Sequence, residues 1–83
     1  MARFPFGQRG LLMDAEMNRL VGTRIHTVRR ERSMTLRQLA RKTSLSVSLL
    51  SQIELGKSAA SISSMHKIAF VLGVPLADLF DGV

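Results

Sequence analysis

Apolar residues recur at helical spacing in the first half of this 83-residue chain. Val21, Ile25 and Val28 stand at positions i, i+4 and i+7, and arginines occupy several of the positions around them. This spacing gathers the apolar side chains on one face of a helix and leaves the charged ones on the other. It therefore predicts an amphipathic helix that begins at about residue 14 or 18 and ends at residue 32.

A second, shorter helix is predicted directly after a break in this pattern. Thr35 is followed three residues later by Gln38, which is the signature of a capping box. In such a box the hydroxyl accepts a hydrogen bond from a free amide of the first turn, and the glutamine reaches back to the amide of the cap residue. We expect a helix over residues 36 to about 42, with Leu39 and Ala40 buried.

The segment SLSVSLLSQIELGK, residues 44–57, has two interpretations. The alternation of serine with apolar residues at its start is typical of a half-buried strand. From Leu50 onward the apolar positions return to helical spacing, and no second strand candidate exists to pair with the first. We therefore expect a turn, with Ser46 as the N-cap of a third helix over residues 47 to about 55 and Gly56 as its left-handed ending.

Two further helices complete the predicted domain. Ser61 is another N-cap candidate, and apolar residues at helical spacing follow it until Gly73 ends the helix. Pro75 is tolerated at a first helical position, so it opens a fifth helix. The apolar residues expected to give that helix a buried face are Leu76, Leu79 and Phe80. The sequence thus predicts an all-α fold of five helices in one domain, residues 14–83, behind a loosely ordered leader, residues 1–13.

Length and composition allow one small core without cross-links. A chain of 83 residues is near the size at which a single core is marginally stable. It contains no cysteine, so neither disulfides nor thiolate metal ligands are available, and a reducing cytoplasm is permitted. The longest apolar run, residues 68–77, contains a glycine and a proline and is far too short to span a bilayer. We interpret it as core and expect no membrane partner.

Basic residues are concentrated in one part of the sequence. Twelve lysines and arginines against six acidic residues give a formal net charge of +6. Residues 19–42 hold eight of those twelve with Glu31 as their only acid, whereas residues 43–83 are nearly neutral. A localised basic field favours a polyanionic partner, nucleic acid before an anionic membrane surface, and a merely solvated basic face is the alternative.

Residues suited to catalysis are sparse. His26 and His66 lie forty residues apart, and neither has an aspartate or glutamate nearby in the spacing of a catalytic or metal-binding motif. The five methionines are more typical of core filling than of a ligand site. The sequence therefore predicts no enzyme, no catalytic residue, no metal and no cofactor.

Two short helices joined by a three-residue turn match a helix-turn-helix, whose second helix enters the major groove of DNA. Residues 21–80, about three quarters of the chain, resemble the lambda-repressor-like, or XRE-family, helix-turn-helix domain. The resemblance rests on RRER before the motif, TLRQLA at the second helix, SVSLLSQIELGK across the third and KIAFVLGVPLADLF at the end. The chain is similar in particular to the N-terminal domain of bacterial regulators of the XRE-cupin type.

This resemblance implies a compact five-helix DNA-binding domain of a cytoplasmic bacterial transcriptional regulator. Its partner would be a double-stranded DNA operator, recognised in a sequence-specific manner by a homodimer. A sensor domain or a partner protein outside this chain is also implied.

Carried onto this sequence, the resemblance makes residues 47–55 the recognition helix. With Leu50 and Ile53 buried, the outward positions form one continuous face. The expected contacts to DNA bases are Val47, Ser48, Ser51 and Gln52, with Leu55 at the end of the same face. Glutamine can bond adenine in a bidentate pair, a serine hydroxyl donates or accepts, and valine can contact a thymine methyl group. A merely solvated polar face is the alternative.

Contacts to DNA phosphates are expected where helix N-termini and cations converge. The residues concerned are Thr35, Arg37, Ser46, Lys57, Ser58 and Ser61. By analogy with the family, Arg29 pairs with Glu54 and so fixes the recognition helix to the domain. Two residues depart from the family pattern: Ser44 stands where a glycine usually provides a positive φ, and Leu36 stands where a polar side chain often bonds a phosphate.

A protein-binding module, such as an antitoxin or an accessory subunit, is the alternative function of the same fold. Apolar residues outside the motif could form a partner surface or a dimer interface. They are Phe4, Phe6, Leu11, Leu12, Met13, Phe70 and Val83. For a dimer we expect contacts from Phe70, Leu76, Phe80 or Val83. Binding to random duplex that falls steeply with added salt would distinguish a DNA-binding protein from an adaptor.

Overall fold

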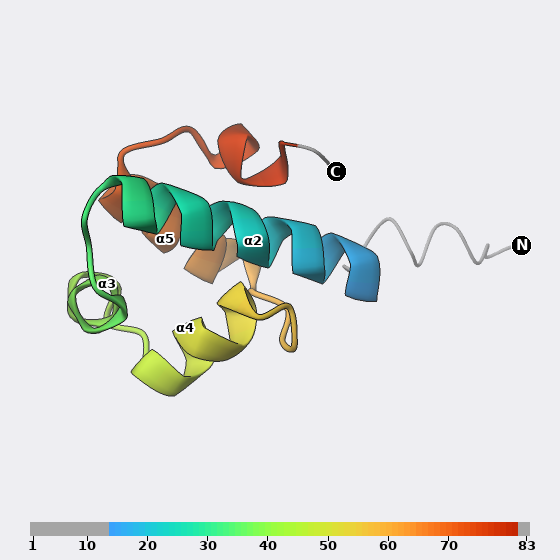
Figure 1. Cartoon of the computed structure of the whole chain (residues 1–83), viewed down its shortest axis with the longest axis horizontal. Helices are drawn as coiled ribbons and strands as arrows, with labels where there is room; N and C mark the ends of the chain where they lie inside the picture. Colours follow the sequence, from blue (N-terminus) through green and yellow to red (C-terminus); the bar gives the residue numbers. More distant parts are fainter. Residues whose placement is uncertain (1–13, 82–83) are drawn as a thin grey trace, which may run out of the picture.

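The computed structural model describes residues 14–81, and over this range all the regular elements are helices, without a strand (Figure 1). The elements in order are α2 (Ala15–Glu31), α3 (Leu36–Thr43), α4 (Val47–Glu54), α5 (Ile62–Leu72) and the 3-10 helix η1 (Leu76–Phe80). The prediction of an all-α fold is confirmed. The predicted leader, residues 1–13, with its apolar side chains, and Val83 lie outside the described residues.

Helix α2 is the element against which most of the others pack. It contacts α4, η1 and α5, while α3 packs on α4 and α5. In Figure 1, α4 lies below α2, η1 lies above it, and α3 stands near its C-terminal end. The core between these elements contains Val21, Ile25, Val28, Leu39, Ala40, Leu50, Ile53, Ala60, Met65, Ile68, Ala69, Leu72 and Leu79. The helix-turn-helix, α3 and α4, is thus attached to the rest of the domain through apolar faces of both helices.

Each helix that precedes or forms the motif begins at a side-chain cap. Asp14 accepts a hydrogen bond from the amide of Met17 at the start of α2. At α3, Thr35 and Gln38 form both bonds of the predicted capping box, at 3.0 and 2.8 Å. The hydroxyl of Ser46 accepts from the amide of Leu49 at 3.0 Å, which confirms the predicted cap of α4. These bonds satisfy amides that a helix start otherwise leaves free.

The fourth helix also begins and ends where the sequence places its limits. Ser61 caps α5 by accepting from the amide of Ser64, and Gly73 ends it in the left-handed conformation. The fifth helix was predicted with the wrong type, because η1 is a five-residue 3-10 helix and not an α-helix. In η1 the amide of Asp78 donates a hydrogen bond to the carbonyl of Pro75, three residues back. So short a segment completes i→i+3 bonds more readily than several i→i+4 bonds.

Ser44 has the left-handed backbone that the family pattern predicts at this turn. Its φ is 63°, at the C-cap of α3, and Ser33 after α2 has a φ of 54°. A side chain with a Cβ is strained in this region, and glycine is not. The turn geometry is therefore retained without the residue that fits it best.

Ser44→Gly should raise the free energy of unfolding by roughly 0.5 to 1 kcal/mol, because it removes this strain. The greater conformational freedom of glycine in the unfolded chain offsets part of the gain. Urea unfolding of the two proteins measures the difference. Ser44→Ala is the matched control, since it keeps the Cβ and should give no gain. A lower midpoint for Ser44→Gly than for the parent would contradict the strain.

Candidate nucleic-acid interface

Helices α2 and α4 approach each other closely at Gly22, in the middle of α2. A Cβ placed on this buried glycine would overlap the carbonyl oxygen of Ile53 and lie 2.8 Å from that of Glu54. Both carbonyls belong to the last turn of α4. The missing side chain of Gly22 therefore lets the backbone of the two helices touch, and it sets how far α4 lies from α2.

A second close approach follows immediately after α4. Gly56 has a φ of +76°, and a Cβ there would lie 2.7 Å from the Cα of Arg19 on α2. The amide of Gly56 bonds the carbonyl of Ile53, and the next two amides bond that of Gln52. Glycine is needed both for the left-handed turn and for the space. The chain thus leaves α4 along a path fixed by α2.

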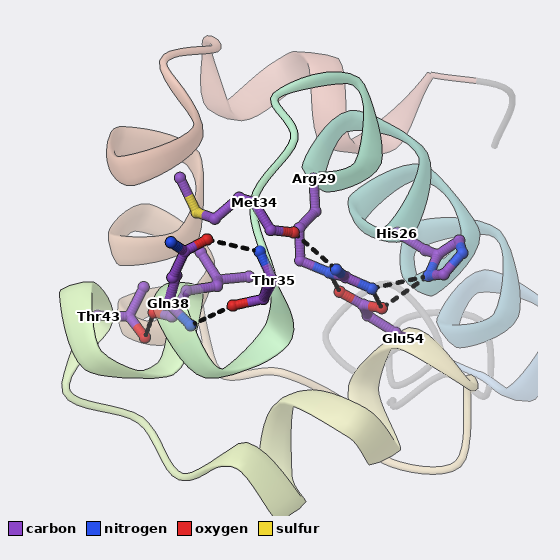
Figure 2. Close-up of polar contacts among 8 residues, drawn as sticks. His26, Arg29, Met34, Thr35, Gln38, Thr43 and Glu54 are labelled. Carbon is purple, nitrogen blue, oxygen red and sulfur yellow. Dashed lines mark hydrogen bonds and ion pairs between the residues drawn. The ribbon is translucent and has the colours of Figure 1, made fainter.

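A buried ion pair joins the same two helices (Figure 2). Arg29 Nε donates to Glu54 Oε2 at 2.7 Å and Nη2 donates to Oε1 at 3.0 Å. The third donor, Nη1, bonds the carbonyl of Met34 at 2.8 Å, in the loop between α2 and α3. The side chains of Arg29 and Glu54 are only 9% and 7% exposed. One guanidinium therefore links α2, the loop before α3 and the end of α4.

The face of α4 directed away from these contacts is open to solvent. Leu50 and Ile53 are buried, whereas Ser48 and Gln52 are exposed and Ser51 is half-buried. Apolar residues on this helix are also exposed: Val47 by 42%, Leu49 by 37% and Leu55 by 59%. The structure therefore brings together the four residues expected at DNA bases, Val47, Ser48, Ser51 and Gln52, and we call this set the outer face of α4.

The residues expected at phosphates lie at three helix starts and in the loop after α4. Thr35, Ser46 and Ser61 are N-caps whose oxygens accept amides of their own helices. Ser61 also donates its hydroxyl to Ser64 at 3.0 Å, so that proton is already engaged. Arg37 and Lys57 are exposed, and Ser58 is half-buried. The first amides of a helix have no carbonyl partner within it, so those that the caps leave free are able to bond an anion.

The start of α3 borders a shallow basic hollow of about 410 Å³. It lies on the side of the motif where α2 ends. Its lining residues are Arg29, Arg30, Ser33, Met34, Thr35 and Leu36. Leu36, which cannot bond a phosphate through its side chain, contributes an apolar wall, so only its amide is available to an anion there.

Four of the eight basic residues in residues 19–42 bond other groups of the chain, three of them across the fold and one on the surface. Arg24 donates to the carbonyl of Asp78 at 3.0 Å, and Arg32 donates to that of Leu72 at 2.9 Å. Arg29 is in the buried ion pair, and Arg19 pairs with Glu16 on the surface. The basic residues of this segment left for a polyanion are Arg30, Arg37, Arg41 and Lys42. A hydrogen bond to a carbonyl does not neutralise an arginine, so the interpretation of residues 19–42 as one basic field stays a prediction.

Two residues of the α2–α4 contact were missed by the sequence analysis. Gly22 carries a weak signal, since a glycine within a helix is unfavourable unless close packing requires it. His26 gives no signal at all, because its partner Glu54 lies 28 residues away. The structure places its Nδ1 2.8 Å from Glu54 Oε1, a carboxylate that stands outside any motif spacing in the sequence.

Neither a metal site nor a membrane-spanning helix is found within residues 14–81. No group of three or more histidine, aspartate or glutamate side chains comes together there in a way that could hold a metal ion. None of the helices in the same range has the length and apolar character needed to cross a membrane.

Known proteins share this sequence pattern. The family model described as Helix-turn-helix matches residues 25–79. The immunity repressor protein of Bacillus phage phi105 is 40% identical over 57 residues, which are 69% of this chain and 40% of the repressor. The HTH-type transcriptional regulator DdrOP3 of Deinococcus deserti is 32% identical over 60 residues, 72% of this chain and 46% of the regulator. The chain spans less than half the length of either relative.

A solved structure shares the arrangement of the helices. The HTH_3 family transcriptional regulator from Vibrio cholerae superposes with a TM-score of 0.77 at 28% sequence identity. The match covers 82% of this chain and 38% of that protein. The order and packing of α2 to η1 are therefore those of a known regulator domain.

Proposed function

We propose that this chain, which belongs to the helix-turn-helix family, binds double-stranded DNA in a sequence-specific manner as part of a bacterial transcriptional regulator. The observation that carries the proposal is the outer face of α4. It offers hydroxyl, amide and methyl groups to solvent on a helix whose other side is fixed by Leu50, Ile53 and a buried ion pair. A polar face held this rigidly suits base edges in a major groove.

Phosphates on either side of the groove would bind at the helix starts. The amides at the start of α3 and α4 carry the positive end of the helix dipole, and Arg37 and Lys57 add full charges near them. The hollow beside Arg30 and Thr35 provides space at the start of α3. Such contacts set the register of α4 on the duplex, and the outer face then reads the sequence.

Gln52→Ala should weaken binding to the preferred site by about 1 to 3 kcal/mol and relax the preference at one base pair, because an amide can bond adenine at two atoms. Folding should be unchanged, since this side chain is exposed. Affinities for a site selected from random duplex, and for its single-base variants, measure the effect.

Lys57→Ala is the matched control for Gln52→Ala. Its side chain is exposed in the loop after α4, so its loss should weaken binding to all sequences equally and reduce the salt dependence. Equal weakening by Gln52→Ala on every sequence would make Gln52 a phosphate contact. Binding to random duplex that does not respond to salt would favour the protein-binding alternative.

A homodimer on a two-fold operator is part of the proposal. One recognition helix reads only a few base pairs, which is too little to select a site in a genome. Phe70 on α5 is 86% exposed, which is unusual for a phenylalanine without a partner, and Leu76 and Phe80 of η1 are half-buried nearby in the sequence. These residues offer an apolar surface for a second copy.

Two copies on one operator should have half-site centres about 34 Å apart, one turn of the duplex. Lengthening the spacing by about five base pairs turns the second half-site to the opposite side and should abolish cooperative footprinting. Cooperativity that survived the insertion would favour independent monomers. A cytoplasmic location and a sensor domain or partner protein outside this chain remain predictions from the sequence.

A further inference from the structure

The first turn of α4 exposes two apolar side chains. Val47 is 42% exposed and Leu49 is 37% exposed. Neither belongs to the hydrophobic core or to the partly buried side chains that pack against it. At 3.6 residues per turn, the two lie on either side of the exposed Ser48. Leu49 thus adds a second apolar side chain beside the outer face of α4.

The backbone that carries these side chains is fixed before any partner binds. The amide of Leu49 donates to the hydroxyl of Ser46 at 3.0 Å, and the amide of Leu50 donates to the carbonyl of Ser46 at 3.1 Å. Leu50 itself is fully buried, so the first turn is anchored in the core. The N-terminal residues of a recognition helix are those that contact base edges. Val47 and Leu49 therefore occupy fixed positions at the end of α4 that meets the bases.

Helix α4, residues 47–54, contains no arginine or lysine. Guanine offers two acceptors in the major groove, and these two side chains are its commonest partners. Glutamate can accept from cytosine, but both carboxylate oxygens of Glu54 already accept from Arg29. Gln52 has an amide that matches the donor and the acceptor of adenine. The chemistry of α4 therefore favours A·T over G·C base pairs.

We propose that the base pairs read by α4 are A·T pairs, and that Val47 and Leu49 each contact the C5 methyl group of a different thymine. This inference rests on the proposed function and names the base pairs that α4 selects. The thymine methyl is an apolar group in the major groove, and cytosine lacks it. Its burial against an apolar side chain is favourable because apolar surface leaves water.

The test starts from a site selected from random duplex and replaces its thymines, one at a time, by deoxyuridine, which lacks only the C5 methyl group. The affinity of the parent chain should fall roughly threefold to fivefold at each of the two contacted thymines, as expected for the loss of one buried methyl group. Val47→Ala should abolish the effect of deoxyuridine at one of these thymines, and Leu49→Ala should abolish it at the other. Both variants should stay folded, because alanine is a good helix former, and circular dichroism checks this.

Ile62→Ala is the matched control, because Ile62 is also a large exposed apolar residue, at 62%, but is the first residue of α5. It should keep both effects of deoxyuridine. Effects that persist in both α4 variants would overturn the proposal, since the methyl groups would then act through the shape of the duplex. An effect that persists in one variant overturns the assignment of that residue. The absence of any effect in the parent chain, or a selected site that requires guanine under α4, would also overturn the proposal. Failure to prefer any site over random duplex would instead refute the proposed function, and this inference with it.

Discussion

Replacing Gly22 by alanine should lower the free energy of unfolding by about 2 to 4 kcal/mol, even though alanine is the better helix former by about 1 kcal/mol. The added Cβ would overlap the carbonyl oxygen of Ile53 in the last turn of α4. Two backbones cannot yield as a flexible side chain would, so α4 must move away from α2. Urea unfolding followed by circular dichroism measures the loss.

Thr27→Ala is the matched control for Gly22→Ala. Thr27 lies on the exposed side of the same helix, so its replacement gains helix propensity without a contact. It should leave the domain slightly more stable. The two substitutions should therefore change the free energy of unfolding in opposite directions. A Gly22→Ala variant more stable than the parent would show that the backbones of α2 and α4 leave room for a Cβ at this position.

Gly22→Ala should also impair DNA binding beyond the loss of folded protein. The carbonyls that meet Gly22 belong to the end of α4, so a displaced contact tilts the outer face relative to the helix starts that we place on phosphates. Binding to a selected site, measured under conditions where the variant is folded, should therefore fall more than binding to random duplex.

Helix limits could be predicted because their causes are local. Thr35 with Gln38, Ser46 with Leu49 and Ser61 with Ser64 are each three residues apart, so each cap is visible in a short window of sequence. The type of η1 was not accessible in the same way. Five residues after a proline satisfy either helix pattern, and the two helix types differ in whether the amides bond carbonyls three or four residues back.

The contacts that orient α4 depend on residues far apart in sequence. His26 and Glu54 are 28 residues apart, and Arg32 reaches the carbonyl of Leu72 across 40. Nothing in the local pattern distinguishes Arg32, which bonds the carbonyl of Leu72, from Arg30, although both residues are exposed. The pairing of Arg29 with Glu54 was accessible only through the family resemblance. Sequence periodicity thus predicts which residues face outward on α4, and the packing decides how α4 is held.

Breaking the buried ion pair between Arg29 and Glu54 should cause a second large loss of stability. Arg29→Met should lower the free energy of unfolding by about 3 to 5 kcal/mol, because it leaves the carboxylate of Glu54 buried without its main partner. It also removes the donor to the carbonyl of Met34. Arg19→Met, in the exposed pair with Glu16, is the matched control and should cost less than about 1 kcal/mol.

The double variant Arg29→Met/Glu54→Leu separates two quantities: the net contribution of the ion pair to stability, and the destabilisation caused by leaving one of its charges unpaired. With both charges gone, no buried charge is left unpaired, so the double variant should be more stable than Arg29→Met alone. The carbonyl of Met34 still loses its donor, and the parent stability should therefore not be fully regained. Urea unfolding of the parent, both single variants and the double variant gives the coupling energy. A double variant no more stable than Arg29→Met would mean that the loss comes from the Met34 bond and from packing, and that Glu54 is held well enough by His26.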